Sequence, residues 1–229
     1  MAEVEAVVFD MDGVIVDTEA AYCRILMDFF GRHGVPLGWD EVGAIVGCAA
    51  PVYRGHLERW LARVPRPDPA WAAMGAEEVV EPAFSVLDGR LGELAMPGLH
   101  RCLDGLCERG IPCAVASCSS PAEIAEALDG CGVRDRFAAV VSGHEVARSK
   151  PAPDVYLEAA RLLGVDPRRC VAVEDSDTGI EAARAAGLFV VARRETRFGF
   201  SQGAAHRVVD CLDEVPPVVD GLSIDTRGR

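Results

Sequence analysis

Two aspartates, Asp10 and Asp12, follow a short apolar run near the start of the chain. The run 7–9 predicts a buried parallel strand, and ligands bind at the carboxyl ends of such strands in open α/β sheets. Side chains at positions i and i+2 of an extended segment point the same way, so the two carboxylates should lie together. Such a pair resists joint ionisation unless a cation lies between the two groups or one keeps its proton. The pair therefore predicts a hard metal site or a nucleophile beside an acid, with a solvated Asp/Gly turn as the alternative.

Two later segments offer a hydroxyl and a cation that suit a phosphate. Ser117 and Cys118 follow the apolar stretch CAVA, where backbone N–H groups at a helix start could hold a phosphate oxygen. An ordinary helix cap is the alternative for this segment. Lys150 stands before Pro151 and Pro153, which stiffen the start of the next helix. We therefore expect Lys150 to point inward as a fixed cation, whereas a lone lysine is usually solvated.

A second acidic pair, Glu174 and Asp175, ends another apolar run. Because parallel strands present their carboxyl ends at one edge of the sheet, this pair should lie near Asp10. Ser176 or Asp177 is expected to cap the helix that follows. A capping role for all of these acids is the alternative reading.

The apolar runs recur in a rhythm that indicates an α/β fold. Strands are predicted at 112–116, 138–142, 170–174, 188–192 and 207–209, with helices between them. Such a βαβ rhythm implies a parallel, helix-covered sheet with right-handed crossovers.

A helical block separates the first strand from the others. It is predicted to contain helices over 18–33, 39–46, 51–64 and 69–87, and no strand. We expect two domains, a catalytic core of 1–17 and 92–229 and a helical insert of 18–91. The insert directly follows the first acidic loop, so it is placed to act as a lid. The lid is expected to move about the linkers 14–18 and 88–97. Glycines 89, 92 and 98 are expected to absorb the dihedral change, with the ordinary presence of glycine in loops as the alternative.

Composition excludes several classes of protein. The formal net charge of −13 opposes binding to nucleic acid or to an anionic membrane. No apolar run approaches the roughly 20 residues of a membrane span, and the N-terminus lacks the pattern of a signal peptide. The nine cysteines show neither a C-x-x-C pair nor zinc-site spacing, so we expect free thiols in a reducing, cytoplasmic setting.

Taken together, the four motifs resemble those of the haloacid dehalogenase superfamily. The first motif is the segment 10–17, DMDGVIVD, and the second is Ser117. The third is Lys150 before PAPD, and the fourth is EDS at 174–176 with the GI of 179–180. The resemblance implies a Rossmann-like core with an inserted α-helical cap, similar to phosphoglycolate phosphatase and beta-phosphoglucomutase.

The resemblance also implies a role for each motif residue. Asp10 would be the nucleophile that becomes an aspartyl-phosphate, and Asp12 the acid and base. Ser117, with Cys118, and Lys150 would hold the phosphoryl oxygens. A magnesium ion would be bound by metal ligands that comprise Asp10, the Asp12 backbone carbonyl and Asp175, with Glu174 ligating or supporting it.

Departures from neighbouring families narrow the expected reaction. Dehalogenases and phosphonate hydrolases of the superfamily lack the second aspartate, so Asp12 favours phosphoryl transfer. Beta-phosphoglucomutase carries a lysine and an asparagine where this chain has Ser120 and Pro121, so we expect a phosphatase acting on a small sugar or metabolite phosphate. A phosphosugar mutase is the alternative, and a binding or regulatory protein on the same fold is a remote one.

Substrate specificity is expected to come from the cap. Four residues there are candidate contacts with the substrate, although an ordinary helix face explains them as well: Tyr22, Cys48, Arg54 and His56. Asp17, at the junction of core and cap, is expected to be structural. The partner expected is a small phosphate ester, and the expected oligomeric state is a monomer or weak dimer.

Overall fold

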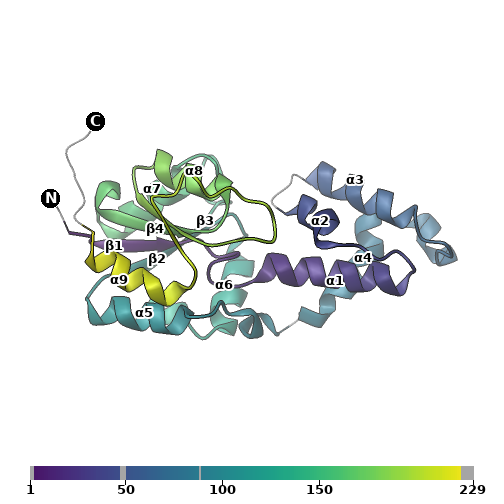
Figure 1. Ribbon diagram of the computed structural model, residues 1–229, viewed down its shortest axis with the longest axis horizontal. Helices are drawn as coiled ribbons and strands as arrows, with labels where there is room; N and C mark the ends of the chain where they lie inside the picture. The colour runs from purple at the N-terminus through teal and green to yellow at the C-terminus, as the bar shows by residue number, and fades with distance from the viewer. Residues whose placement is uncertain (1–2, 47–49, 88, 223–229) are drawn as a thin grey trace. The chain divides into compact units, whose positions relative to one another are not determined.

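The chain folds into two compact units, seen in a computed structural model that describes residues 3–46, 50–87 and 89–222 (Figure 1). The first unit contains the N-terminal strand as far as Asp17, the segment Leu91–Glu195 and the chain from Phe200 onward. The second contains Thr18–Arg90 together with Thr196–Gly199. The chain therefore passes between the units four times.

The first unit is built on a six-stranded parallel sheet with the strand order β3-β2-β1-β4-β5-β6. The strands are β1 (Ala6–Phe9), β2 (Cys113–Ser117), β3 (Ala139–Ser142), β4 (Cys170–Glu174), β5 (Phe189–Arg193) and β6 (Arg207–Val209). This sheet confirms the predicted α/β architecture. The edges of β2 and β5 lie one residue later than predicted, so that β5 ends on Arg193 instead of Ala192.

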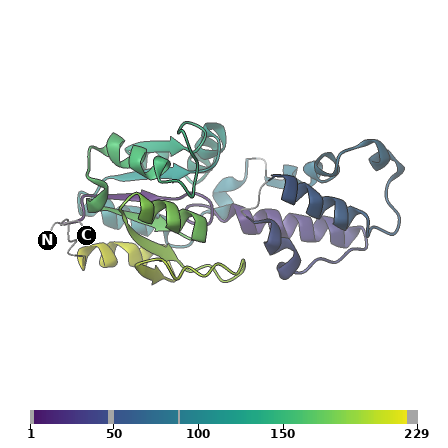
Figure 2. The ribbon, with the colours of Figure 1, turned by 90° about the horizontal axis from the view of Figure 1, so that it is seen from above.

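Helices cover both faces of this sheet (Figures 1 and 2). They are α5 (Leu99–Glu108), α6 (Pro121–Gly130), α7 (Asp154–Leu163), α8 (Asp177–Ala185) and α9 (Val215–Asp220). Alternate strand residues point to opposite faces. Val7 and Phe9 of β1 accordingly pack with α5, α6 and α9, while Ala6 and Val8 pack with α7 and α8. Because β1 is buried on both faces, its end cannot shift, and the residue after it has a fixed position.

In the second unit, the regular secondary structure of the described residues is helical, and loops connect the helices. Its helices are α1 (Thr18–Arg32), α2 (Trp39–Val42), α3 (Ala50–Leu61) and α4 (Ala76–Phe84). Aromatic and aliphatic side chains from these helices, including Phe30, Leu57, Trp60 and Val80, form a core of their own. This separate core is what allows the unit to be compact by itself.

The structure corrects two of the predicted helices in this unit. The segment 69–87 is not one helix, because a 3-10 turn over Pro69–Ala73 ends before α4 begins at Ala76. Gly75 is the N-cap of α4, and its N–H donates to the Glu78 carboxylate at 2.6 Å. The segment 39–46 likewise contains α2 followed by a 3-10 turn over Gly43–Ile45. In both places, the helical spacing of apolar residues in the sequence continues across a point where the α-helix is interrupted.

Candidate active site

Three carboxylates gather at the carboxyl ends of β1 and β4. The two strands are neighbours, with Phe9 opposite Val173, and the Asp10 N–H donates to the Val173 carbonyl at 2.9 Å. Asp10, Glu174 and Asp175 each offer a carboxylate oxygen, and these oxygens lie within 4.8 Å of one another. The strand register thus brings together two motifs that are more than 160 residues apart in the sequence.

Lys150 lies among these acids, with its side chain only 4% exposed. Its ammonium donates to Asp10 Oδ1 and to Glu174 Oε1, each at 2.7 Å. The buried Tyr156 hydroxyl also donates to Glu174 Oε1, and the Lys150 ammonium lies 4.9 Å from the centre of the Tyr156 ring. Glu174 therefore orients the cation.

Burial and mutual repulsion shift the acid and base equilibria of these groups. Burial, and then the charge of Glu174, raises the pKa of Asp10 to about 7. The same two causes, with Asp10 as a further one, raise the pKa of Asp175 well above its ordinary value. Burial opposes the charge on Lys150, but Asp10 and Glu174 outweigh it and raise the lysine pKa well above its usual range. The cluster therefore keeps Lys150 as a fixed cation, and its remaining negative charge favours a second cation.

Asp12 contacts the second motif. Its Oδ2 accepts a hydrogen bond from the Ser119 hydroxyl at 2.9 Å. Gly13, which follows it, has a φ of +77°. A Cβ there would overlap Asp175 Oδ2, so the close approach of the two loops requires glycine.

The second motif forms a tight loop at the end of β2. The fully buried Ser117 hydroxyl accepts the Ser119 N–H at 3.0 Å, and Cys118, which follows it, is exposed. The Ser149 hydroxyl donates to the Cys118 sulfur at 3.2 Å, which links this loop to the one that carries Lys150. Ser120 caps α6, as the cap alternative for this segment predicted.

A buried network behind the acids was missed in the sequence. Arg193 Nε donates to the Gly13 carbonyl at 2.5 Å, and its Nη2 lies 2.9 Å from Glu195 Oε2 and 3.9 Å from Asp175 Oδ2. Gln202 Nε2 donates to the backbone carbonyls of Asp175 and Arg193 at 2.5 and 2.7 Å. The only signal in the sequence was a charged residue directly after a predicted strand, because the partner of Arg193, Gly13, lies 180 positions away.

The donor set fits a hard divalent cation. Its groups are carboxylate oxygens, the ligands that Mg²⁺ prefers, and they are gathered against a single lysine. Glu174 Oε1 already accepts from Lys150 and Tyr156, and its Oε2 faces the Asp175 N–H at 3.2 Å. Asp10 and Asp175 are therefore better placed than Glu174 to bind a metal directly.

Three of the candidate specificity residues lie in described helices of the second unit, Tyr22 in α1 and Arg54 and His56 in α3. The Tyr22 ring packs against the Phe84 ring, with centroids 5.4 Å apart. Arg54 forms an exposed ion pair with Glu77 at 3.0 Å, and the His56 ring lies beside Trp60. Cys48 lies outside the described residues.

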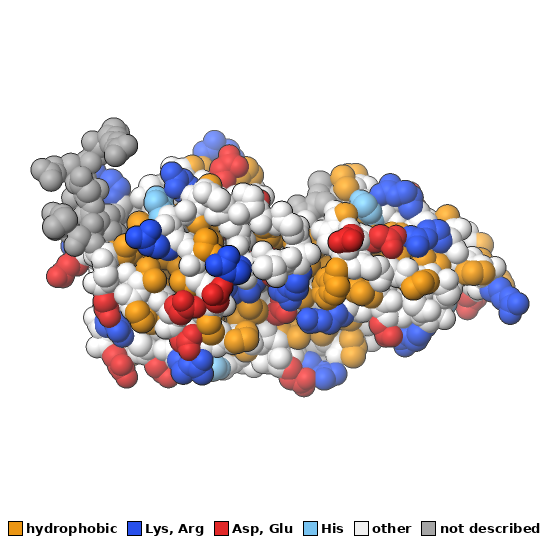
Figure 3. All heavy atoms as spheres, viewed as in Figure 1, with side chains coloured by type: hydrophobic (Ala, Val, Ile, Leu, Met, Phe, Trp, Pro, Cys, Tyr) orange, Lys and Arg blue, Asp and Glu red, His pale blue; other side chains and the backbone are white. Residues whose placement is uncertain are grey.

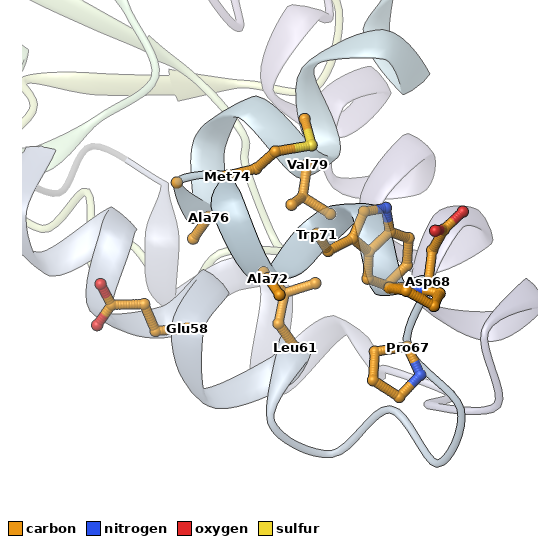
Figure 4. Close-up of a pocket in the computed structure, with 11 residues that line it drawn as sticks. Glu58, Leu61, Pro67, Asp68, Trp71, Ala72, Met74, Ala76 and Val79 are labelled. Atoms are coloured by element: carbon orange, nitrogen blue, oxygen red, sulfur yellow. The ribbon is translucent and has the colours of Figure 1, made fainter.

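A pocket of about 450 Å³ opens within the helical unit (Figure 4). Trp71, Leu61, Met74 and Val79 supply apolar walls, and Asp68 lies beside them. Among the described candidates, Tyr22, Arg54 and His56 are not part of its lining.

The surface carries charges of both signs. On the face shown in Figure 3, acidic and basic side chains are interspersed, without an extended basic patch. Among the described residues, no helix has the length and apolarity needed to span a bilayer.

Comparison with known proteins identifies the family. The profile of the haloacid dehalogenase-like hydrolases matches residues 4–187, most of the chain. The chain belongs to this family. The expected membership and the expected enzymatic class, a hydrolase, are thereby confirmed.

Members of the haloacid dehalogenase-like family with assigned activities are similar over most of the chain. Fructose-1-phosphate phosphatase YqaB of Escherichia coli K12 is 36% identical over 185 residues, which cover 80% of this chain and 93% of that protein. Hexitol phosphatase B of the same organism is 32% identical over 189 residues, covering 81% and 82%. A solved hydrolase of this family from Deinococcus radiodurans R1, with bound phosphate and sodium, superposes with a TM-score of 0.81. It is 26% identical, and the match covers 98% of this chain and 100% of that one.

Proposed function

We propose that this chain is a Mg²⁺-dependent phosphatase that hydrolyses a small sugar or polyol phosphate through an aspartyl-phosphate. The observation that carries the proposal is the position of Asp10. Asp10 directly follows the buried strand β1. Its carboxylate pairs with Lys150 at 2.7 Å and lies in one cluster with Glu174 and Asp175. A nucleophile held beside a fixed cation and an oxygen-ligand cluster suits attack on phosphorus.

Each group of the cluster has a distinct role in this proposal. Asp10 attacks the phosphorus, and Asp12, oriented by the Ser119 hydroxyl, protonates the leaving oxygen and then takes a proton from water. Lys150 and the loop at Ser117 hold the phosphoryl oxygens. Glu174 keeps Lys150 charged and directed toward Asp10.

Mg²⁺ would be held by the carboxylates of Asp10 and Asp175 and by the Asp12 carbonyl. When bound, it neutralises charge on the phosphoryl oxygens. The carboxylates of the cluster and Asp12 carry up to four negative charges against one on Lys150, so a phosphate dianion is repelled until a divalent cation enters. The same imbalance explains why a phosphatase built on this site depends on its metal.

The substrate class rests on the relatives. Two phosphatases that are more than 30% identical over about four-fifths of this chain carry names that specify fructose 1-phosphate and hexitol phosphates. Sugar and polyol phosphates are therefore the first compounds to test. In the second motif, Ser120 is used as the cap of α6 and Pro121 has no N–H, which favours hydrolysis over a mutase that grips a second phosphate.

The experiment is a phosphate-release assay on chelator-treated protein, with and without Mg²⁺, over sugar, polyol and aryl phosphates. We expect Mg²⁺-dependent release of inorganic phosphate, and its loss in Asp10→Asn because an amide cannot attack phosphorus. Isomerised sugar phosphate in place of free phosphate would instead indicate a mutase. Undiminished turnover by Asp10→Asn, or by the metal-free protein, would contradict the proposal.

A further inference from the structure

The end of β5 and the segment after it form a buried clasp against Gly13 and Asp175, and no part of the proposed chemistry uses it. Its members are Arg193, Glu195 and Gln202, with side chains that are nearly inaccessible. Burying a guanidinium and a carboxylate is unfavourable unless they are paired and hydrogen-bonded. The cost of burying these charged groups suggests that the network has a function.

Arg193 connects two loops that are remote in the sequence. Its Nε donates to the carbonyl of Gly13, the residue after Asp12, and its Nη2 lies 3.9 Å from Asp175 Oδ2. Its Nη1 donates to the Arg194 carbonyl at 3.0 Å, and Glu195 pairs with Nη2 at 2.9 Å. The planar guanidinium uses its separate donors in three directions, which a lysine ammonium on a flexible stem cannot reproduce.

Gln202 fixes the same region through the backbone. It is the one residue other than glycine with a positive φ, 50°, among those that the structure describes. Its amide donates to the Asp175 and Arg193 carbonyls, and its Oε1 accepts the Glu195 N–H at 3.1 Å. The Asp177 carboxylate accepts its N–H at 2.8 Å. A left-handed backbone at such a residue persists only when its surroundings hold it, and such residues concentrate at functional sites.

We propose that Arg193 and Gln202 are positioning residues for the metal site. Arg193 holds the loop of Asp12 and Gly13 against Asp175, and Gln202 fixes the Asp175 backbone. They act through these groups and touch neither substrate nor metal. The inference rests on the proposed function, since it concerns the same Mg²⁺ site.

The proposal predicts a specific defect. Loss of the clasp leaves every metal ligand present but allows the two loops to separate, so Mg²⁺ affinity falls while chemistry at saturating Mg²⁺ is largely kept. Removing a group that orients a metal ligand typically lowers metal affinity by about 10- to 100-fold. We expect Arg193→Lys to weaken Mg²⁺ binding at least tenfold, and Gln202→Asn, one methylene too short, to weaken it severalfold.

The test is isothermal titration of Mg²⁺ into the chelator-treated, full-length protein. Arg194→Lys is the matched control, because the neighbouring Arg194 side chain is half-exposed and forms an ion pair with the exposed Asp210. We expect the control to bind Mg²⁺ like the wild type. The concentration of Mg²⁺ for half-maximal activity should rise in Arg193→Lys, with the rate at saturating Mg²⁺ within a few-fold of wild type.

The outcomes separate this inference from the proposed function. If the wild type binds Mg²⁺ and Arg193→Lys binds it within twofold as tightly, the positioning role is wrong and the proposed function stands. If the wild type shows no Mg²⁺ binding, the metal site itself is wrong and both fall. If Arg193→Lys fails to fold, Gln202→Asn decides, and unchanged affinity in that variant overturns the inference.

Discussion

Single residues in this site gain their properties from a few buried neighbours. Glu174 is fully buried, and its Oε1 accepts from both Lys150 and the Tyr156 hydroxyl. Tyr156 therefore shares a carboxylate with the cation that faces the nucleophile. Through this shared carboxylate, Glu174 and Tyr156 influence how strongly Lys150 pairs with Asp10.

Replacing Tyr156 with phenylalanine tests this arrangement. The change leaves the buried Glu174 oxygen without one of its donors, which costs about 1–3 kcal/mol of stability. With one donor fewer on Glu174, Lys150 should pair with it more strongly and hold a phosphate less well, so KM should rise. Denaturant unfolding and steady-state kinetics measure the two effects. As a stability control, Tyr22→Phe, at a half-exposed position, should change the free energy of unfolding by less than about 0.5 kcal/mol.

Asp12→Asn is expected to separate the two halves of the reaction. The asparagine can still accept the Ser119 hydrogen bond and keeps the backbone carbonyl, but it cannot take a proton from water. We therefore expect one burst of leaving group per enzyme from an activated aryl phosphate, followed by a stall. Acid quenching should trap labelled phosphate on the protein. Steady turnover near the wild-type rate would show that Asp12 is not the base.

The sequence predicted the site residues that lie at strand ends, but it did not predict the residues that hydrogen-bond to their loops. Asp10, Glu174 and Asp175 were predictable together because each follows an apolar run in a parallel sheet. Ser119 and Arg193 were not, because their partners lie 107 and 180 positions away and only the folded register brings them near. Contacts made across the sequence leave no local pattern.

At the scale of elements, the backbone of the turn over Leu91–Leu94 packs closely against the end of α6. Gly92 lies within the second linker, in a short helical turn over Leu91–Leu94. A Cβ on Gly92 would overlap the carbonyl oxygen of Gly130, at the end of α6. This glycine was expected to absorb dihedral change in a hinge, and the structure gives it a packing role that its sequence context does not show.

Gly92→Ala is therefore expected to destabilise the core. The added methyl forces the turn and α6 apart, and overpacking of this kind typically costs about 1–3 kcal/mol. The control is Gly31→Ala in α1, where nothing lies within 4 Å of the new methyl and helix propensity favours alanine. Urea unfolding should show a loss of stability for the first variant and none for the second. Equal stability of Gly92→Ala and the wild type would mean that the packing is not tight there.

At the scale of the whole molecule, the net charge is −13, and the negative charges that interact most strongly are those of the buried acids. Exposed carboxylates on the surface are interspersed with basic groups and screened by solvent (Figure 3). The buried cluster has little such relief. The response of the protein to pH and to Mg²⁺ should therefore be dominated by these few groups.

The last prediction concerns this linkage between protons, Mg²⁺ and stability. Burial, followed by the charge of Glu174, raises the pKa of Asp10 to about 7, above its ordinary value of 3.8. Between these two pH values the folded, metal-free protein holds a proton that the unfolded chain has released. The contribution of Asp10 to stability is therefore fully present below the lower value and is lost as pH rises through the window.

Because Mg²⁺ competes with that proton, the stabilisation by Mg²⁺ should grow as pH rises from about 5 to about 8. Thermal unfolding with chelator or with saturating Mg²⁺ across this range measures the difference in Tm. In Asp10→Asn, which has no proton to release at this position, the difference should be smaller and less dependent on pH. A wild-type shift that stays constant across the range would show that Mg²⁺ binds away from Asp10, and the acidic cluster would then need another explanation.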